Sequence, residues 1–180
     1  MTIMEDTHLL IDKDTLILNE SDLKNNGEII LGTNGFIIES QNFPIYGDGI
    51  EIFTIKPETY LNNIGGLGLS VEISDLNSNT TLSRGHTDIY PTQISVSRWF
   101  EFSPSINATN IFFQYDPNEL NQLESNYLNI YNLDSKGDWN NYFGANGIGF
   151  TFFDNSFLRK INTITLVEGD NQITVFPNPG

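Results

Sequence analysis

Histidine and serine are the first residue types to consider for catalysis, and neither occurs in a recognisable catalytic motif of this chain. A serine hydrolase needs a Ser, His and Asp set, but the Gly-x-Ser-x-Gly motif is absent. His8 and His86 are the only histidines, and their wide separation argues against a zinc site. His86 could pair with Asp88, but we interpret it as a surface loop residue. We therefore predict no catalytic residue.

Carboxylates are the second candidate, because glycoside hydrolysis requires two of them facing across a cleft. The pairs close in sequence are Asp48 with Glu51, Asp116 with Glu119, and Asp134 with Asp138. Turn residues flank each pair, which favours solvated loops. Calcium is the functional alternative, because Asp, Asn and backbone oxygens are its preferred ligands. Asp134 and Asp138 are the candidate ligands, although their loop does not match an EF-hand.

Aromatic residues give the remaining candidate site. The segment Gly137-Asp-Trp-Asn-Asn-Tyr-Phe-Gly144 places flat rings beside Asn and Asp side chains. Such a surface is typical of a sugar-binding platform on a β-sandwich. The predicted ligand-binding residues are Trp139, Tyr142, Asp138 and Asn140. The alternative is that Trp139 closes the end of the sandwich core.

The charge of the chain restricts its partners. It has 23 acidic and 8 basic residues, which gives a formal net charge of −15. This charge repels phosphate backbones and anionic lipid headgroups, so we expect no nucleic-acid partner. No apolar run approaches the length of a membrane span, so we expect no membrane insertion. Cysteine is absent, so disulfides say nothing about the compartment.

Apolar and polar residues alternate along most of the chain, a pattern typical of half-buried strands. In the segment 94–102, Ile94, Val96, Phe100 and Phe102 share one face and Trp99 lies on the other. We predict an all-β fold, an antiparallel two-sheet β-sandwich of jelly-roll or Ig-like type over residues 42–170. The expected strands are His8–Asp12, Thr15–Leu18, Glu28–Leu31, Gly35–Ser40, Ile50–Ile55, Gly68–Ser74, Thr92–Phe102, Thr109–Tyr115, Tyr127–Leu133, Gly147–Phe153, Lys160–Val167 and Gln172–Phe176.

Residues 1–41 have short strands at near-regular steps with Asn-Gly turns. This spacing predicts a β-meander or a solenoid-like segment that packs on the rest, with a boundary near residues 41–49. Asp116, Pro117 and Glu119 predict one or two helical turns. We interpret Gly65-Gly-Leu-Gly68 as a turn and not as a phosphate-binding loop.

The last residues carry a family resemblance. Thr174-Val-Phe-Pro-Asn-Pro-Gly180 follows an alternating strand and resembles the opening of the type A C-terminal sorting domain. That domain marks proteins exported by the type IX secretion system of Bacteroidetes, so residues 171–180 would be its start. The first residues lack the basic and apolar regions of a signal peptide. We therefore expect the chain to be an internal piece of a longer precursor.

A second resemblance covers most of the chain in short motifs. These motifs are similar to a series in large Bacteroidetes surface proteins, where a β-sandwich precedes the sorting domain. The resemblance implies an exported protein with a non-catalytic stalk or binding module, and it implies no catalytic residue. The motifs are Arg98-Trp-Phe-Glu-Phe102, Ile111-Phe-Phe-Gln-Tyr115, Glu119-Leu120, Leu128-Asn-Ile-Tyr131, Asp138-Trp139 and Asn162-Thr-Ile-Thr165.

The predicted function is that of a non-enzymatic module in a secreted or cell-surface bacterial protein, for adhesion, stalk formation or glycan binding. The expected location is extracellular or on the outer cell surface. The expected partners are surface glycans and, through the tail, the type IX secretion machinery. No cofactor is expected apart from the structural calcium considered above. The competing interpretation is an accessory domain of, or a divergent, extracellular glycoside hydrolase.

Overall fold

The protein, seen in a computed structural model, is described over residues 1–40, 42, 44–56, 60–75 and 80–169. The regular elements in these ranges are β-strands and short 3₁₀ helices, which confirms the all-β class. The elements are β1 Thr2–Ile3, β2 His8–Ile11, β3 Thr15–Leu18, β4 Leu23–Asn25, β5 Glu28–Leu31, β6 Phe36–Glu39, β7 Ile45–Tyr46, β8 Ile50–Thr54, β9 Tyr60–Leu61, η1 Ile64–Gly66, β10 Leu69–Asp75, β11 Thr81–Gly85, β12 Ser95–Gln114, η2 Pro117–Glu119, η3 Ser125–Tyr127, β13 Leu128–Leu133, β14 Trp139–Asn141, β15 Ala145–Gly147 and β16 Phe150–Glu168.

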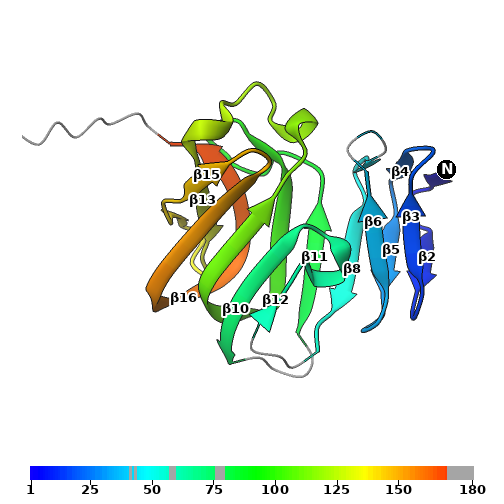
Figure 1. The fold of residues 1–180 in the computed structure, drawn as a ribbon, viewed down its shortest axis with the longest axis horizontal. Coiled ribbons are helices and arrows are strands. Elements are labelled where there is room, and N and C mark those ends of the chain that lie inside the picture. Colours follow the sequence, from blue (N-terminus) through cyan, green and yellow to red (C-terminus); the bar gives the residue numbers. More distant parts are fainter. Residues whose placement is uncertain (41, 43, 57–59, 76–79, 170–180) are drawn as a thin grey trace, which may run out of the picture.

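The first eight strands stack in parallel as the rungs of a solenoid (Figure 1). One face holds β1, β4 and β7, a second holds β2, β5 and β8, and a third holds β3 and β6. Equivalent residues are 20 to 22 positions apart, as from His8 to Glu28 and from Thr2 to Lys24. A meander would pair its strands antiparallel, so of the two alternatives the structure has the solenoid. The parallel stacking continues through β8, beyond residues 41–49.

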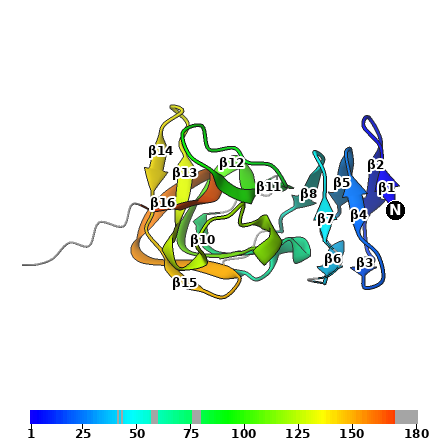
Figure 2. The ribbon, with the colours of Figure 1, turned by 90° about the horizontal axis from the view of Figure 1, so that it is seen from above.

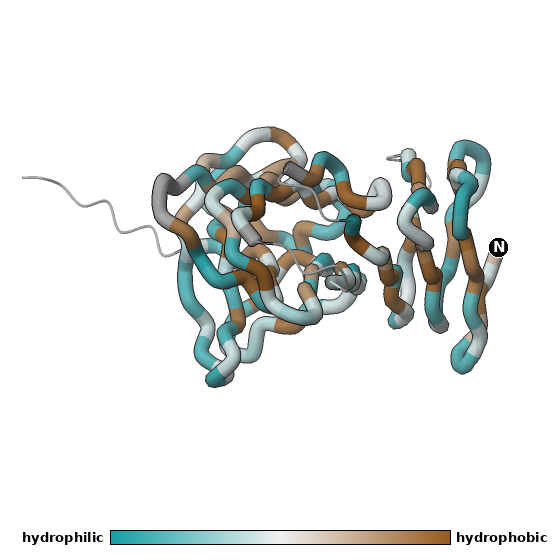
Figure 3. The backbone as a smooth tube through the Cα atoms, turned by 90° about the horizontal axis from the view of Figure 1, so that it is seen from below, coloured by the Kyte–Doolittle hydropathy of each residue, from teal (hydrophilic) through white to brown (hydrophobic). Residues whose placement is uncertain are grey.

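Alternating side chains build the solenoid interior. Ile11, Leu31 and Phe53 occupy equivalent inward positions on successive rungs and are at most 8% exposed. Their outward neighbours remain accessible, and Leu10 is 62% exposed. In Figure 3 the rungs carry hydrophobic stretches, coloured brown, between hydrophilic ones, coloured teal. Burial of such stacked apolar side chains stabilises each of them by about 1.5–3 kcal/mol.

Strand β8 joins the solenoid to the sandwich. It pairs in parallel with β5 on one side and antiparallel with β11 on the other. The mixed sheet therefore runs without a break in the order β14-β13-β16-β12-β11-β8-β5-β2. The solenoid and the sandwich share one hydrogen-bonded sheet.

Two long strands, β12 and β16, contribute to both layers of the sandwich. The first half of β12 pairs with β11, and after a register shift between Glu101 and Ile106 its second half pairs with β10. The end of β16 pairs with β13, whereas its beginning pairs with β15. Figure 2 shows these strands around a common interior. There the rings of Phe100 and Phe113 meet edge to face with centroids 4.9 Å apart.

The smaller predictions have mixed outcomes. The helical turn is confirmed as η2, where Asp116 and Glu119 form a capping box. The two strands expected at 92–102 and 109–115 are one continuous strand, β12. The expected strand at 172–176 and the tail that resembles a sorting domain lie outside the described residues. Among the described residues, no helix is long and apolar enough to cross a membrane.

Candidate functional site

A buried cluster of six ionisable side chains lies where the solenoid meets the sandwich. Its side chains are between 0% and 15% exposed. The solenoid contributes two carboxylates, and the sandwich side contributes two guanidinium groups, one imidazole and one carboxylate. The members of this charge cluster are Glu39 of β6, Glu51 of β8, Arg84 of β11, His86, Arg98 of β12 and Glu119 of η2.

Glu51 and Arg84 form the centre of the charge cluster, and both side chains are fully buried. Glu51 occupies the inward position that Ile29 has on the preceding rung, and it pairs in register with Arg84 on β11. Arg84 Nε donates to Glu51 Oε2 at 2.9 Å, and Arg84 Nη1 donates to Glu39 Oε2 at 3.2 Å. Asn25 Nδ2 donates to Glu51 Oε1 at 2.8 Å. These bonds compensate for the removal of the charges from water.

Arg98 and Glu119 form the second half of the cluster. Arg98 Nε and Nη2 lie 3.0 and 2.9 Å from Glu119 Oε1. His86 connects the two halves, because its Nε2 is 2.8 Å from Glu51 Oε2 and its Nδ1 is 3.9 Å from Glu119 Oε1. With His86 protonated, three positive groups face three carboxylates. The cluster is then balanced in charge.

The pKa values of the cluster follow from burial and charge. Burial alone would raise the pKa of Glu51, but His86 and Arg84 outweigh burial and lower it to about 2. Burial would also raise the pKa of Glu119, yet Arg98 brings it down to about 2. Burial would lower the pKa of His86, but Glu51 and the hydrogen bond with Glu119 raise it above its usual 6.5. For all three groups the surroundings therefore stabilise the charged form relative to the free side chain.

The glycine-rich loop at residues 63–68 contacts the charge cluster through its backbone. Leu67 O accepts from Arg84 Nη1 at 3.2 Å and from Arg98 Nη1 at 3.5 Å. Gly66 has a φ of +78°, and a Cβ there would lie 1.8 Å from Ile37 O, so only glycine fits. The turn predicted for residues 65–68 is therefore present, and it delivers a backbone acceptor to both arginines.

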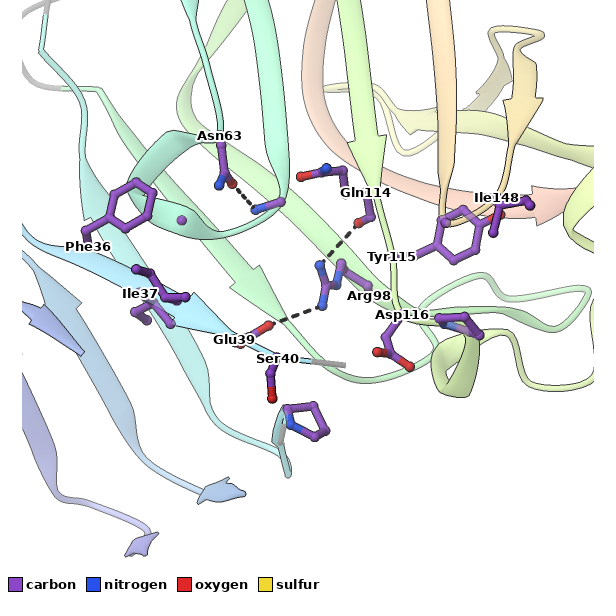
Figure 4. A pocket seen from close by; sticks show the side chains of 16 residues that line it. Phe36, Ile37, Glu39, Ser40, Asn63, Arg98, Gln114, Tyr115, Asp116 and Ile148 are labelled. Atoms are coloured by element: carbon purple, nitrogen blue, oxygen red, sulfur yellow. Dashed lines mark hydrogen bonds and ion pairs between the residues drawn. The ribbon is translucent and has the colours of Figure 1, made fainter. Parts of the chain in front are cut away.

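A cavity of about 440 Å³ opens beside the charge cluster (Figure 4). One wall is formed by residues 36–40 at the end of the solenoid, and the opposite wall by Gln114, Tyr115 and Asp116. Arg98 and Glu39 reach it from the cluster. We call it the junction cavity.

The predicted residue Trp139 lies in a different aromatic cluster from the expected one. Its ring meets Tyr90 edge to face at 5.0 Å, and Tyr90 meets Tyr131 at 5.1 Å. All three side chains are half-buried. Tyr131 alternates with the buried Ile130, and Trp99 alternates with the buried Phe100, so both point to the outer face of the sheet. We call this surface the outer aromatic face.

Tyr142 is separated from Trp139. Its ring stacks on Phe153 at 5.6 Å, and Asn132 Nδ2 donates to its hydroxyl at 3.3 Å. Asn132 is buried on the inner side of β13, so Tyr142 closes one end of the sandwich interior. A second cavity of about 370 Å³ lies there, lined by Tyr142, Asn140, Asp134 and others. The structure therefore brings Tyr142 and Asn140 together and places Trp139 elsewhere.

The candidate calcium ligands form the turn between β13 and β14. Asp134 Oδ1 accepts from the backbone N–H groups of Lys136 at 2.8 Å and Asp138 at 3.0 Å. These two backbone bonds lower the pKa of Asp134. Asp138 is exposed. In the part of the chain that the structure describes, no three His, Cys, Asp or Glu side chains are arranged to hold a metal ion.

The interpretation of His86 as a surface residue is wrong. Its side chain is 4% exposed and contacts Glu51 and not Asp88, which instead accepts from Tyr90 N and Ser95 Oγ. Glu51 does not share a loop with Asp48, because Glu51 points inward while Asp48 is exposed. The rung spacing was the signal that could have found Glu51, since 22 residues separate it from the inward Ile29.

Comparison with known proteins gives no assignment. No protein-family model, curated protein or solved structure matches the chain.

Proposed function

We propose that the protein is a non-enzymatic, glycan-binding spacer module of a secreted or cell-surface protein. The observation that carries this proposal is the outer aromatic face, where Trp139, Tyr90 and Tyr131 form a partly exposed cluster. Large rings on a rigid sheet offer apolar area at a small cost in side-chain entropy, while their polar edges remain hydrated. Sugar rings present matching apolar C–H faces. A half-buried aromatic cluster is therefore suited to stacking on them.

The surroundings of the outer aromatic face support the same use. Trp99 lies against Gly85, where a Cβ would come within 2.3 Å of the indole ring. Trp99 Nε1 donates to Thr87 Oγ1 at 3.3 Å, and Asn141 Nδ2 donates to the hydroxyl of Tyr131 at 3.1 Å. Both tryptophans of the chain thus lie on this face, and Trp99 Nε1 and the Tyr131 hydroxyl are held by hydrogen bonds. Such pre-organisation reduces the cost of ordering side chains on binding.

The spacer role is supported by the continuous sheet through β8 and by the charge cluster beneath it. A joint built from sheet hydrogen bonds and buried ion pairs resists bending more than a flexible linker does. The module would therefore hold its binding face at a fixed distance from neighbouring parts of a surface protein.

Export through type IX secretion, with a location outside the cell, is part of the proposal. Its support is the likeness of residues 174–180 to a sorting domain and the similar motif series in Bacteroidetes surface proteins. The net charge of −15 agrees with a glycan partner and disfavours nucleic acid. Structural calcium at Asp134 and Asp138 stays a prediction.

A divergent glycoside hydrolase is the second candidate, because Glu39 and Asp116 both line the junction cavity (Figure 4). Such an enzyme needs one carboxylic acid with a raised pKa to protonate the leaving group. Glu39 is instead ion-paired with Arg84 and Arg98, while Glu51 and Glu119, whose pKa values are lowered to about 2, do not line this cavity. Incubation with nitrophenyl glycosides separates the two functions, and we expect no turnover.

The test of glycan binding is a polysaccharide array probed with the wild type and two variants. Trp139→Ala removes the outer ring, and loss of about 1.4 kcal/mol of stacking weakens binding about tenfold. Tyr142→Ala is the matched control, because it removes an aromatic ring on the opposite side of the sheet. Equal binding by wild type and Trp139→Ala would contradict the proposal. So would binding that is lost only in Tyr142→Ala.

A further inference from the structure

We propose that the junction cavity is a second, independent binding site, which takes a single pyranose unit of a neutral sugar. It goes beyond the outer aromatic face, because it is built from different elements and lies on the side of β12 where Arg98 points. The volume of about 440 Å³ falls within the range of small-molecule pockets, about 300–1,000 Å³. The cavity is therefore large enough for one sugar ring with its bound water.

The floor of the junction cavity presents a donor and an acceptor side by side. Arg98 Nη2 and Glu39 Oε2 are 3.6 Å apart, which is too long for a hydrogen bond between them. Nη2 has two hydrogens and contacts Glu119 with one side, while Oε2 has two lone pairs and accepts from Arg84 Nη1. Within the described ranges each group therefore retains one free hydrogen-bonding position. Two neighbouring hydroxyls of a sugar can donate to Glu39 and accept from Arg98.

The walls of the junction cavity complete a mixed surface. Ser40 Oγ is buried and has no hydrogen-bond partner in the described ranges, and the side chain of Gln114 is exposed. A buried hydroxyl without a partner is unfavourable, so a ligand hydroxyl there would be stabilised. Phe36, Ile38 and Ile148 add apolar area around the same space, as Figure 4 shows for Phe36 and Ile148. Alternating polar and apolar walls match the hydroxyl edges and C–H faces of a pyranose.

Two other ligand classes fit less well. An added peptide strand would need the free edge of β6, but Gly66 packs directly against the backbone of Ile37 and covers that edge. An anion would meet Glu39 and Asp116 in the lining, while both arginines are already paired with carboxylates. A neutral ligand avoids both conflicts.

The test is a titration of the ¹⁵N-labelled full chain, followed by amide chemical shifts, with the methyl glycosides of glucose, galactose, mannose and xylose. We expect saturable shifts at Glu39, Ser40, Gly68 and Gly149 with at least one glycoside. The same shifts are expected in Trp139→Ala, which separates this site from the outer aromatic face. Gln114→Ala, which leaves every ion pair of the charge cluster in place, should weaken the affinity about fivefold, and Ser40→Ala should weaken it about as much.

Three results would overturn the proposal. The first is the absence of shifts at these amides with all four glycosides. The second is an unchanged affinity in both Gln114→Ala and Ser40→Ala. The third is a set of shifts that appears with an acetylated tripeptide and with none of the glycosides. The array result for Trp139→Ala stands apart from all three, so each site can fail without the other.

Discussion

Replacement of Arg84 by methionine should lower the free energy of unfolding by about 3–5 kcal/mol, the usual cost of removing one partner of a buried ion pair. Arg84 and Glu51 are both 0% exposed, so water cannot replace the lost guanidinium. The variant removes the contacts from Arg84 to Glu51, Glu39 and Leu67 O. Methionine retains much of the side-chain volume, so the loss reports charge and hydrogen bonds more than a cavity.

Urea unfolding monitored by circular dichroism measures this loss, because a lower midpoint at an unchanged m value reports stability alone. Arg159→Met is the matched control. Arg159 is exposed and its guanidinium carbon lies 5.8 Å from the ring centroid of Tyr142, an interaction worth about 0.5–1 kcal/mol. The two variants make the same chemical change in buried and exposed surroundings.

The double variant Glu51→Gln/Arg84→Met sharpens the result. Glutamine leaves no buried charge behind, so the double variant should be more stable than Arg84→Met alone, with a positive coupling between the sites. A loss for Arg84→Met no larger than that for Arg159→Met would refute the assignment of the charge cluster as the joint between solenoid and sandwich. An absence of coupling with Glu51 would refute it as well.

Two further predictions concern pH and the glycine loop. The pKa values of Glu51 and Glu119 are lowered from 4.5 to about 2, so their stabilisation is complete above pH 4.5 and is lost as the pH falls toward 2. The pKa of His86 is raised from 6.5, so its stabilisation is complete below pH 6.5 and is lost as the pH rises through the folded value. The urea midpoint should therefore be highest between about pH 4.5 and 6.5. His86→Gln should abolish the decrease of the midpoint at higher pH. A midpoint that does not change with pH in the wild type would contradict both statements. Gly66→Ala should lower the melting temperature more than Gly137→Ala. Both glycines have positive φ, but only at Gly66 would a Cβ clash with backbone atoms of another segment. Equal melting temperatures of the two variants would exclude this clash.

The fold was predictable from sequence where neighbours in the chain determine it. Alternation along single strands located β5, β8 and β13 within a residue or so. Strand β11 was not predicted, because it contains Arg84 at an inward position and so lacks the apolar alternation of a core strand. The choice between solenoid and meander depends on pairing between rungs, which composition and turns do not determine.

The candidate sites were less predictable because their members come from distant segments. Trp139 was expected beside Tyr142. The two residues are three positions apart at β14, and their rings lie on opposite sides of the sheet. The rings that do accompany it, Tyr90 and Tyr131, come from a loop before β12 and from β13. The charge cluster likewise collects residues from 39 to 119, and single pairs close in sequence could not reveal it.

The most direct test of glycan binding by the outer aromatic face is intrinsic tryptophan fluorescence. The chain has two tryptophans, Trp99 and Trp139, and both lie on that face, so their emission reports little else. Addition of a polysaccharide bound in the array should change the emission in a saturable manner, with a weaker response in Trp139→Phe. Emission that stays constant while the array shows binding would contradict glycan binding at this face.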